Sequence, residues 1–572
     1  MSEHTDGAAA RSATGQPVKD WLPGLAQNWK YDVVAGLIIF LIALPLSLGI
    51  ALASGAPPIA GIISAIISGM LVSLLSGSHV TINGPAAGLI VIVLGAVTEL
   101  GAGDMAAGFR CALAVGVVCG AIQIGLGLLK AGRLTDFFPL SVVHGMLAGI
   151  GVIIMVKQIF LALGATAPKV GMVHLIESIP GGFVHLNPAI ALIGLISVLI
   201  MILWPKWKIG LTKAVPAPLV ATIIAVGLGY VFDLSHKHDY TFLGRTYSVG
   251  PTYLVQGLPH TLSTWFTLPD FSKITSDVSI RFIVMYVFVA SLESLLTAAA
   301  VDKLDPFGRR SDMNRELIGK GIGNMLSSAI GGLPMIAEVV RSKANIMSGA
   351  RTRWANFFHG LFLLVFVALA PSLLEMIPLA ALAGILVVIG YRLANPGDFV
   401  HAWKLGKEEF IAMVVTILLV VGQDLLVGVA TGVVVGLIIT LFRGSRLELF
   451  QDASGAYVLK CHGPLTFANF VGVRKKLDSV PKGSRVVLDF TECSLVDHTA
   501  VERLHDFEVE FTRNGGQVER LGLERLVSST ADPFSAQFVA TKPQDLSRPV
   551  AHFDGAVAHS PAPKPPTPTR TP

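Results

Sequence analysis

The sequence predicts a polytopic α-helical membrane protein that carries a small soluble α/β domain near its C-terminal end. Of its 572 residues, 52% are hydrophobic and only 14% are charged, whereas about a quarter of the residues in a soluble protein are charged. The hydrophobic residues come in runs of about twenty, the length that crosses the core of a bilayer. Basic residues gather in every second connection between these runs, which is typical of multi-pass proteins.

Residues 33–443 form the predicted transmembrane domain, with about fourteen hydrophobic segments. Several segments are short or interrupted by Gly and Pro, as is usual for helices that pack inside a protein rather than face lipid. We place the segments at 33–53, 59–76, 84–99, 105–129, 139–164, 187–204 and 214–232, then at 279–301, 314–331, 335–348, 354–372, 376–392, 408–422 and 424–442.

No cleavable secretion signal is evident, because the first apolar run follows a polar lead of about thirty residues and is long enough to span a bilayer. We therefore expect residues 1–32 to form an N-terminal cytoplasmic segment. Its last part, WLPGLAQNWKYD (21–32), contains Trp21, Trp29 and Tyr31, which suit the headgroup region.

The charges predict that both termini face the cytoplasm. In that orientation the cytoplasmic connections hold the basic residues and the short outer connections hold mainly acidic ones, as the positive-inside rule expects. The acidic residues are Glu99, Asp104, Glu375 and Asp424, and the basic ones include Lys130, Arg133, Lys206, Lys213, Lys303, Arg309, Arg310, Arg351, Arg353, Arg392, Lys404, Lys407, Arg443 and Arg446.

The two halves of the transmembrane domain resemble each other. The third segment follows GSHVTINGPAAG (77–88), and the tenth, which is the third of its half, begins with GGLPMIAEVVRS (331–342). Gly/Pro-interrupted segments at matching positions indicate a binding site near the middle of the membrane. With seven segments in each half, the second half has inverted topology, so we predict 7+7 inverted repeats.

The C-terminal part has a different composition. Residues 446–530 contain two expected strands and an expected helix, which predict a small cytoplasmic α/β domain. Residues 532–572 end in HSPAPKPPTPTRTP, so we expect a disordered Pro-rich tail. The four cysteines, Cys111, Cys119, Cys461 and Cys493, have no metal-site or disulfide spacing and are interpreted as packing residues.

Four motifs resemble the SulP family of anion transporters and occur in the order typical of that family. The similarity extends over about 30–530 and implies inorganic anion transport, a C-terminal STAS domain and a homodimer. The chain departs from the family pattern at Leu46, where many members carry Gln. The motifs are DVVAGLIIFLIALPLSLGIALASGAPPIAG (32–61), LSGSHVTINGPAAG (75–88), GGLPMIAEVVRSKANIMSGARTRWANFFHG (331–360) and LDFTECSLVDHTAVERL (488–504).

The starts of segments three and ten are the candidate substrate site. Half-helix N-termini have unpaired, aligned N–H groups that attract an anion, and small side chains allow close approach. The alternative is that these residues only permit tight helix packing. The resemblance places substrate here, and the candidate residues are Gly84, Ala86, Ala87, Ala337, Glu338, Val339 and Arg341.

Three charged residues of the transmembrane domain are assigned roles. Arg341 matches a family arginine near the anion site, although an ion pair with Glu338, three residues earlier, is the structural alternative. The resemblance puts both Glu293 and Glu338 beside the substrate. Two carboxylates near an anion need compensation by a proton or a cation, so we assign Glu293 to coupling, with protons favoured over sodium.

The leading function is secondary active transport of bicarbonate or sulfate by alternating access across a plasma membrane, specifically a bacterial inner membrane. The alternatives are a proton-coupled permease for a C4-dicarboxylate or a nucleobase, and an uncoupled channel or STAS-linked sensor. We expect no enzyme activity, cofactor, metal site or nucleic-acid partner, and the absence of a Walker-type loop disfavours a primary pump. In the C-terminal domain, Thr499 is either a phosphorylation site or, with Asp497, a helix cap.

Overall fold

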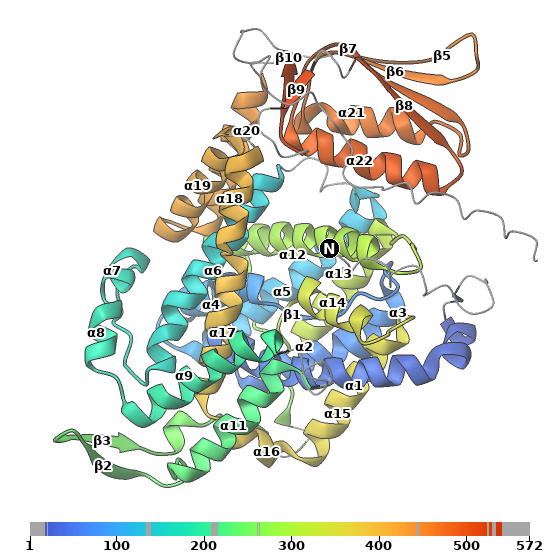
Figure 1. Cartoon of the computed structure of the whole chain (residues 1–572). Helices are drawn as coiled ribbons and strands as arrows, with labels where there is room; N and C mark the ends of the chain where they lie inside the picture. The colour runs from blue at the N-terminus through green and yellow to red at the C-terminus, as the bar shows by residue number, and fades with distance from the viewer. Residues whose placement is uncertain are drawn as a thin grey trace, which may run out of the picture. The chain divides into compact units, whose positions relative to one another are not determined.

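The computed structural model describes residues 18–19, 21–132, 139–207, 215–259, 261, 264–405, 407–441, 446–522, 526–528 and 534–539. These residues form two compact units. The first draws on 1–135, 144–395 and 415–431, and the second draws on 136–143, 396–414 and 432–572. The helices of the transmembrane domain and the strands of the C-terminal domain are labelled in Figure 1.

The described part of the chain has seven helices that are long and apolar enough to cross a membrane, and several shorter apolar helices. The predicted polytopic helical fold is therefore confirmed. In chain order the elements of this part are α1 (Trp21–Ala53), α2 (Pro58–Ile67), η2 (Ser68–Val72), α3 (Ser73–Leu75), β1 (Asn83–Pro85), η3 (Ala87–Leu89), α4 (Ile90–Gly101), α5 (Met105–Leu128), α6 (Leu140–Ala162), α7 (Met172–Glu177), α8 (Ile179–Val184), α9 (Pro188–Leu203), η5 (Trp204–Lys206), α11 (Ala217–Val231), β2 (His238–Phe242), β3 (Arg245–Val249), η6 (Pro251–Tyr253), α12 (Asp277–Leu304), α13 (Met313–Ala329), β4 (Met335–Ala337), α14 (Val339–Met347), α15 (Trp354–Leu369), α16 (Pro371–Glu375), α17 (Leu379–Leu393), α18 (Pro396–Leu405), α19 (Lys407–Gly422) and α20 (Leu425–Leu441).

The first helix begins earlier than predicted. We expected it to start near residue 33, but α1 runs without interruption from Trp21. Near its middle, the buried carboxylate of Asp32 accepts hydrogen bonds from the backbone N–H groups of Arg351 (2.8 Å) and Thr352 (3.0 Å). These contacts hold the helix against a distant segment, which composition alone does not reveal.

A pair of glycines lets α5 and α13 pack closely. A Cβ atom placed on Gly120 of α5 would lie 2.6 Å from the carbonyl oxygen of Gly321 in α13, and one on Gly321 would lie 2.7 Å from the carbonyl oxygen of Gly120. Such small residues let backbones approach in a membrane, where no hydrophobic effect drives helices together. The α5–α13 pair thereby forms a rigid support beside the broken segments.

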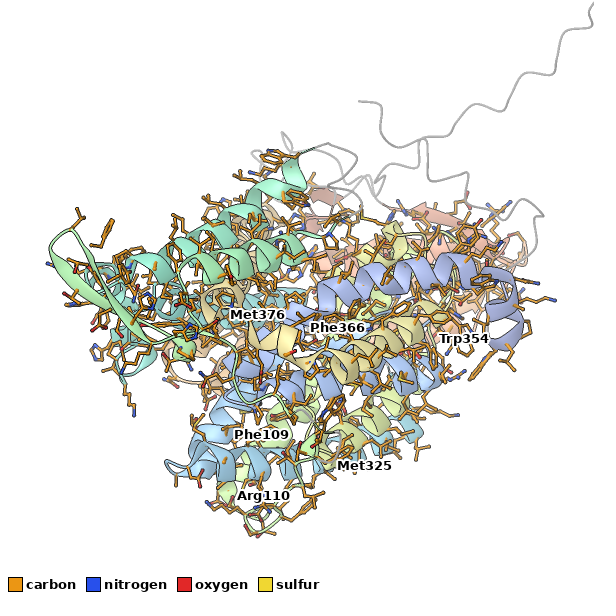
Figure 2. All side chains as sticks on the ribbon, turned by 90° about the horizontal axis from the view of Figure 1, so that it is seen from below. Phe109, Arg110, Met325, Trp354, Phe366 and Met376 are labelled. Carbon is orange, nitrogen blue, oxygen red and sulfur yellow. The ribbon has the colours of Figure 1, made fainter. Side chains whose placement is uncertain are left out.

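Aromatic packing joins α1 to α15. Figure 2 shows α15 with Trp354 at its first residue and Phe366 near its other end. The ring centroids of Phe40 and Phe366 lie 5.5 Å apart, within the range of favourable aromatic pairs. Phe40 of the long helix α1 therefore packs against two aromatic residues of the shorter apolar helix α15, Phe362 and Phe366.

The C-terminal domain is built on a six-stranded sheet with the order β5-β6-β7-β10-β9, and β8 also pairs with β7. Two helices pack against this sheet (Figure 1). The central β6–β7 and β7–β8 pairs are parallel. The elements are β5 (Arg446–Gln451), β6 (Tyr457–Leu465), α21 (Phe467–Asp478), β7 (Arg485–Val496), α22 (His498–Arg513), β8 (Gln517–Leu521), β9 (Leu526–Ser528) and β10 (Gln537–Val539).

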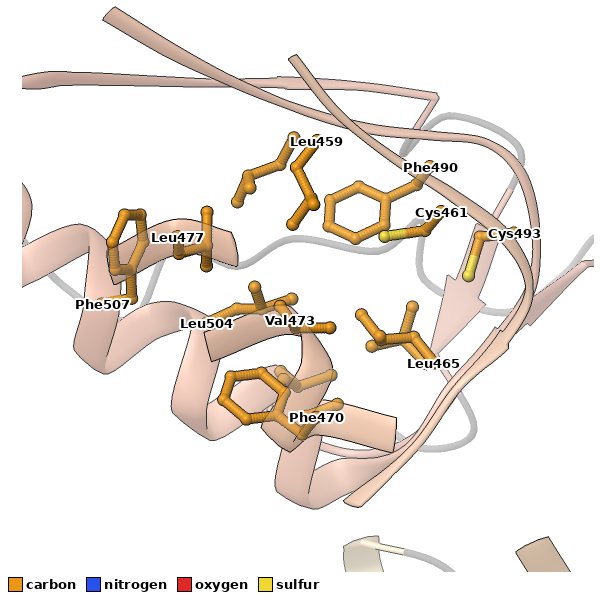
Figure 3. Packing of buried hydrophobic residues seen from close by; sticks show 14 of the residues in the cluster. Leu459, Cys461, Leu465, Phe470, Val473, Leu477, Phe490, Cys493, Leu504 and Phe507 are labelled. Atoms are coloured by element: carbon orange, nitrogen blue, oxygen red, sulfur yellow. The ribbon is translucent and has the colours of Figure 1, made fainter. Parts of the chain in front are cut away.

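The core of this domain lies between the sheet and its two helices (Figure 3). Phe470 of α21 and Leu504 of α22 face Phe490 of β7 within one buried cluster. Cys461 and Cys493 belong to the same cluster and are free thiols, as are the buried Cys111 and Cys119. The interpretation of all four cysteines as packing residues agrees with this structure.

The sheet extends beyond the predicted domain boundary at residue 530. Strand β10 pairs with β7 and β9, so residues 537–539 do not belong to a disordered tail. A strand of three residues has too few positions to show the alternation that marks a strand in sequence. Residues 1–17 and 540–572, where the rest of the predicted N-terminal segment and tail fall, lie outside the described residues.

Candidate functional site

The two broken segments meet as a short antiparallel pair of strands. Asn83 of β1 lies opposite Ala337 of β4, Gly84 opposite Ile336, and Pro85 opposite Met335. All six residues are buried. Segments far apart in the chain thus cross at one point, and each then continues into a helix.

The helices begin later than the sequence predicted. We expected residues 84–87 and 334–337 to open helices, but most of them are extended strand. On one side a 3-10 turn begins at Ala87 and leads into α4, and on the other side α14 begins at Val339. Proline disfavours helical backbone in the residue before it, and strand pairing satisfies the amides that a helix start would leave free.

Arg341 lies in the first turn of α14 and is 1% exposed. Its Nε is 3.2 Å from Oε2 of Glu338, and its Nη2 donates to the carbonyl oxygen of Pro85 at 2.6 Å. One guanidinium therefore contacts both broken segments. The predicted pair with Glu338 is present, and it leaves Nη1 without a hydrogen-bond partner among the described residues.

Gly84 lies directly beneath this guanidinium. A Cβ atom at Gly84 would lie 2.6 Å from Nη1 of Arg341, closer than a side-chain contact allows. The absence of a side chain lets the cation lie directly on the strand. The glycine at position 84 is therefore explained by its contact with the charged side chain of Arg341 rather than by packing between helices.

Glu293 lies in the middle of α12 and reaches the start of the other half-helix. A Cβ atom on Gly88 would be 2.7 Å from Oε1 of Glu293 and still closer to Oε2. The buried Oε2 has no hydrogen-bond partner among the described residues. The next residue, Ser294, accepts a hydrogen bond from the N–H of Ala337 at 3.4 Å, so α12 contacts both broken segments.

The structure therefore brings most of the predicted site residues together. Arg341 lies against Gly84 and is paired with Glu338, and Ala337 is in the strand pair. Ala86 and Ala87 follow β1 and are buried. Val339 differs, because its side chain is 42% exposed.

Sequence reasoning missed a second buried ion pair in α13. Lys320 and Glu316 are both 0% exposed, and Nζ of Lys320 lies 2.5 Å from Oε1 of Glu316. The same Nζ donates to Oδ1 of Asn83 at 2.5 Å. The two charges are one helical turn apart, which is the spacing of an ordinary exposed helix pair, so the sequence alone does not reveal that they are buried.

A chain of side-chain hydrogen bonds holds the other strand, β4. Asn324 of α13 accepts a hydrogen bond from the N–H of Met335 at 2.6 Å and donates to Gln123 of α5 at 2.7 Å. Gln123 in turn donates to Ser291 of α12 at 3.1 Å. Three helices thereby hold β4 in place, and among the residues that the structure describes no cluster of His, Cys, Asp or Glu could hold a metal ion.

Comparison with known proteins matches this architecture to a family. The profile described as the sulfate permease family matches residues 29–416. The chain belongs to the sulfate permease family. The STAS domain profile matches residues 450–531, so the C-terminal sheet and helices are a STAS domain.

Individual relatives agree over most of the chain. Bicarbonate transporter BicA of Synechocystis is 27% identical over 520 residues, which cover 87% of this chain and 88% of the relative. The sodium-independent sulfate anion transporter of Bos taurus is 24% identical over 553 residues, which cover 89% and 86%. Among solved structures, the transmembrane domain of a cyanobacterial BicA aligns with a TM-score of 0.59 and 27% identity, covering 71% of this chain and 97% of that chain.

Proposed function

We propose that this protein is a secondary transporter that moves a small inorganic anion, bicarbonate or sulfate, across the plasma membrane by alternating access. The observation that carries the proposal is the buried guanidinium of Arg341, which contacts Glu338 on its own helix and Pro85 on the opposite broken segment. A charge within a membrane domain is rare and usually functional. An anion also needs positive potential where the dielectric constant is low.

The backbone supplies the rest of the anion site. The N–H groups that open the 3-10 turn before α4, and those that open α14, have no partner within their own turn or helix, and such amides bind anions. Gly84, Ala86 and Ala87 have small or no side chains on one side, and Ala337 and Val339 flank the other. Glu338 offsets part of the charge of Arg341, so the site attracts an anion without holding it permanently.

Glu293 is the proposed coupling residue. Its carboxylate lies against Gly88, at the start of α4, where a negative charge repels an incoming anion. A proton on Glu293 removes that repulsion, so proton and anion favour each other's binding, which is the thermodynamic requirement of symport. Sodium is the alternative coupling ion, and we favour the proton because Glu338 adds a second carboxylate nearby.

The relatives direct the choice of substrates to test first. One is named as a bicarbonate transporter and another as a sulfate anion transporter. The decisive experiment is uptake of labelled sulfate and labelled bicarbonate by proteoliposomes, with a proton gradient and a sodium gradient imposed in separate samples. We expect concentrative uptake of one anion under the proton gradient, and no concentrative uptake of either anion would refute the proposal.

The same preparation separates the alternatives. A C4-dicarboxylate or a nucleobase that competes for uptake, or that is itself concentrated, would favour an organic solute. Flux that follows only the anion's own electrochemical gradient and shows no stimulation by anion on the opposite side would favour a channel. Binding without flux would favour a sensor that signals through the STAS domain.

The proposal includes cytoplasmic termini, a homodimer, a transmembrane domain at 33–443, and a C-terminal domain that begins at 446 and extends past 530 to include β10. The four native cysteines are buried, so a single cysteine placed at Arg309 can be labelled with little background. Labelling from outside intact cells would contradict the proposed orientation.

Deletion of the STAS domain should change regulation or assembly more than substrate choice. The uptake panel measures substrate choice, and the size of the detergent-solubilised protein measures assembly.

A further inference from the structure

The Glu316–Lys320 pair in α13 is not explained by the proposed transport chemistry. Both side chains are fully buried. A buried ion pair seldom adds stability over well-packed apolar residues of similar size. Its presence inside a membrane domain therefore calls for a role beyond holding the helix together.

Lys320 is bound to the strand that carries the proposed site. Its Nζ donates to Oδ1 of Asn83, the first residue of β1, at 2.5 Å. Asn83 is paired with Ala337 of β4, and the next residue, Gly84, lies against the guanidinium of Arg341. A displacement of Asn83 therefore moves the strand on which Arg341 rests.

Glu316 binds the loop that leads into the same strand. Its Oε2 accepts hydrogen bonds from Oγ of Ser76 and from the N–H groups of Gly77 (3.1 Å) and Ser78 (3.3 Å). Its Oε1 contacts Lys320 at 2.5 Å. The pair thus fastens both ends of residues 76–83 to one turn of α13.

Neutral hydrogen bonds also hold Asn83 and the residue before it. The carbonyl oxygen of Asn83 accepts from Ser68 at 2.8 Å, and the N–H of Ile82 donates to Ser342 of α14 at 2.9 Å. Lys320 alone, among the described residues, contacts the Asn83 side chain through a charged group. Charge-assisted hydrogen bonds are shorter and stronger than neutral ones, so Lys320 fixes the first residue of β1 as Arg341 fixes its last residue, Pro85.

We infer that Lys320 is a positioning residue of the anion site, which acts through Asn83 to hold β1 in register with β4 and so to seat Arg341 against Gly84 and Pro85. This inference rests on the proposed transport function. Glu316 balances the charge of Lys320 and keeps its Nζ directed at Asn83.

The test compares Lys320→Met with a paired neutral variant, Glu316→Gln/Lys320→Gln, in the full-length protein. Methionine keeps the volume and removes the hydrogen bond, whereas the glutamine pair keeps donors and acceptors without charge. We expect Lys320→Met to raise the KM for anion uptake about tenfold, the size expected for a lost charged hydrogen bond, with a maximal rate within about twofold of the wild type. The paired variant should recover most of the KM.

A second readout needs no anion. Hydrogen exchange measured by mass spectrometry should be faster over residues 79–86 in Lys320→Met and near the wild-type rate in the paired variant. Lys343→Met, a change at an exposed lysine of α14, is the matched control and should alter neither KM nor exchange in this segment.

The outcomes are distinguishable. Lys320→Met with wild-type KM and wild-type exchange would overturn the inference while leaving the proposed function intact. A paired variant as impaired as Lys320→Met would also overturn it, since its hydrogen bonds are retained. Wild-type protein that takes up none of the tested anions would overturn the proposed function and, with it, the role assigned to Lys320.

Discussion

The two broken segments share a backbone course and differ in their charges. Segment three passes from β1 through a 3-10 turn into α4 and has no charged side chain from Asn83 to Thr98. Segment ten passes from β4 into α14 and carries Glu338, Arg341 and Lys343 within two turns. Both helices nevertheless begin beside a glutamate: α14 has Glu338 at its N-cap, and α4 has Glu293, which is supplied by α12.

The difference shows how a repeated backbone is specialised. In the antiparallel crossing, each half contributes three strand residues, and each residue is paired with one of the other half. The cation, in contrast, belongs to one half only and reaches across to the carbonyl oxygen of Pro85 on the other. An anion at this crossing would therefore meet backbone amides from both segments but a side-chain charge from only one.

Substitution of Glu293 should have the largest effect on transport, because it removes the carboxylate that α12 places beside the start of α4. Glu293→Gln should abolish uptake driven by the proton gradient, since glutamine mimics the protonated acid permanently. Exchange of anion for anion should persist. The measurement is uptake in proteoliposomes under proton and sodium gradients, and a Gln variant that still concentrates anion with the proton gradient removes Glu293 from coupling.

Glu338→Gln is the companion that sharpens this comparison. Glu338 belongs to segment ten and is paired with Arg341, so its neutralisation should change anion affinity and leave the response to the proton gradient in place. Loss of that response in Glu338→Gln, but not in Glu293→Gln, would exchange the roles of the two glutamates.

Arg341→Ala should weaken anion binding next most strongly. The loss of a buried charged hydrogen-bond donor costs about 1.5–3 kcal/mol, or roughly 10- to 150-fold in affinity. Isothermal titration with the transported anion measures the change. Lys343→Ala, on the same helix but exposed, is the matched control, and equal losses for both variants would indicate a general effect of charge rather than a site.

Gly88→Ala should have a smaller effect. The new Cβ would meet the carboxylate of Glu293, and such overpacking costs about 1–3 kcal/mol. We expect a reduced rate under the proton gradient and a lower melting temperature. Gly125→Ala in α5, where an added Cβ meets no atom within 4 Å, is the control and should be neutral or slightly stabilising.

Substitution of Asp497 in the STAS domain should have the smallest effect on transport, but it should change how the free energy of unfolding depends on pH. Asp497 accepts hydrogen bonds from the N–H groups of Ala500 and Phe467, both at 2.7 Å, so one carboxylate caps α22 and α21. Burial, with the nearby carboxylate of Glu409, raises the pKa of Asp497 to about 7. Thr499, the other candidate cap, is fully buried inside α22.

The raised pKa sets the sign of this pH dependence. The folded domain holds the proton more tightly than the unfolded chain, whose Asp pKa is about 3.9. This contribution to the free energy of unfolding is therefore fully present below about pH 4 and is lost as pH rises through about 7. Asp497→Asn should flatten that slope and cost about 1 kcal/mol, because an amide group replaces one of the two accepting oxygens; urea unfolding monitored across this pH range measures both effects.

Asp452→Asn is the control for the direction in which the free energy of unfolding changes with pH. Hydrogen bonds, first from the Ser454 side chain, lower the pKa of Asp452, so its contribution is lost as pH falls below about 4. The slope between pH 4 and 7 should therefore persist in Asp452→Asn. An unchanged slope in Asp497→Asn would contradict the role assigned to that carboxylate.

Local sequence patterns predicted much of this protein. Runs of apolar residues located the spanning helices, paired Gly/Pro breaks located the two crossing segments, and the spacing of Glu338 and Arg341 predicted their ion pair. Each of these features depends on residues that lie close together in the chain, where periodicity and spacing are informative.

The remaining features depend on contacts between distant residues. The β1–β4 pair has three residues in each strand, too few for a periodic pattern. Glu316 and Lys320 have the spacing of an ordinary solvent-exposed helix pair, and only their contacts with Ser76 and Asn83 reveal that they are buried. The burial of Asp32 within α1 likewise becomes evident only from its contacts with Arg351 and Thr352.

The crossing of β1 and β4 also constrains when the site can form during biosynthesis. Arg341 and Pro85, which it joins, are 256 residues apart in the chain. At about 5–20 residues per second, a ribosome needs roughly 13–50 s to make that interval. Throughout this time β1 is without its strand partner β4. The backbone N–H and C=O groups of β1 must therefore find other hydrogen-bond partners while the first half is inserted. Water or the insertion machinery can supply them, as can α13 once it has been synthesised.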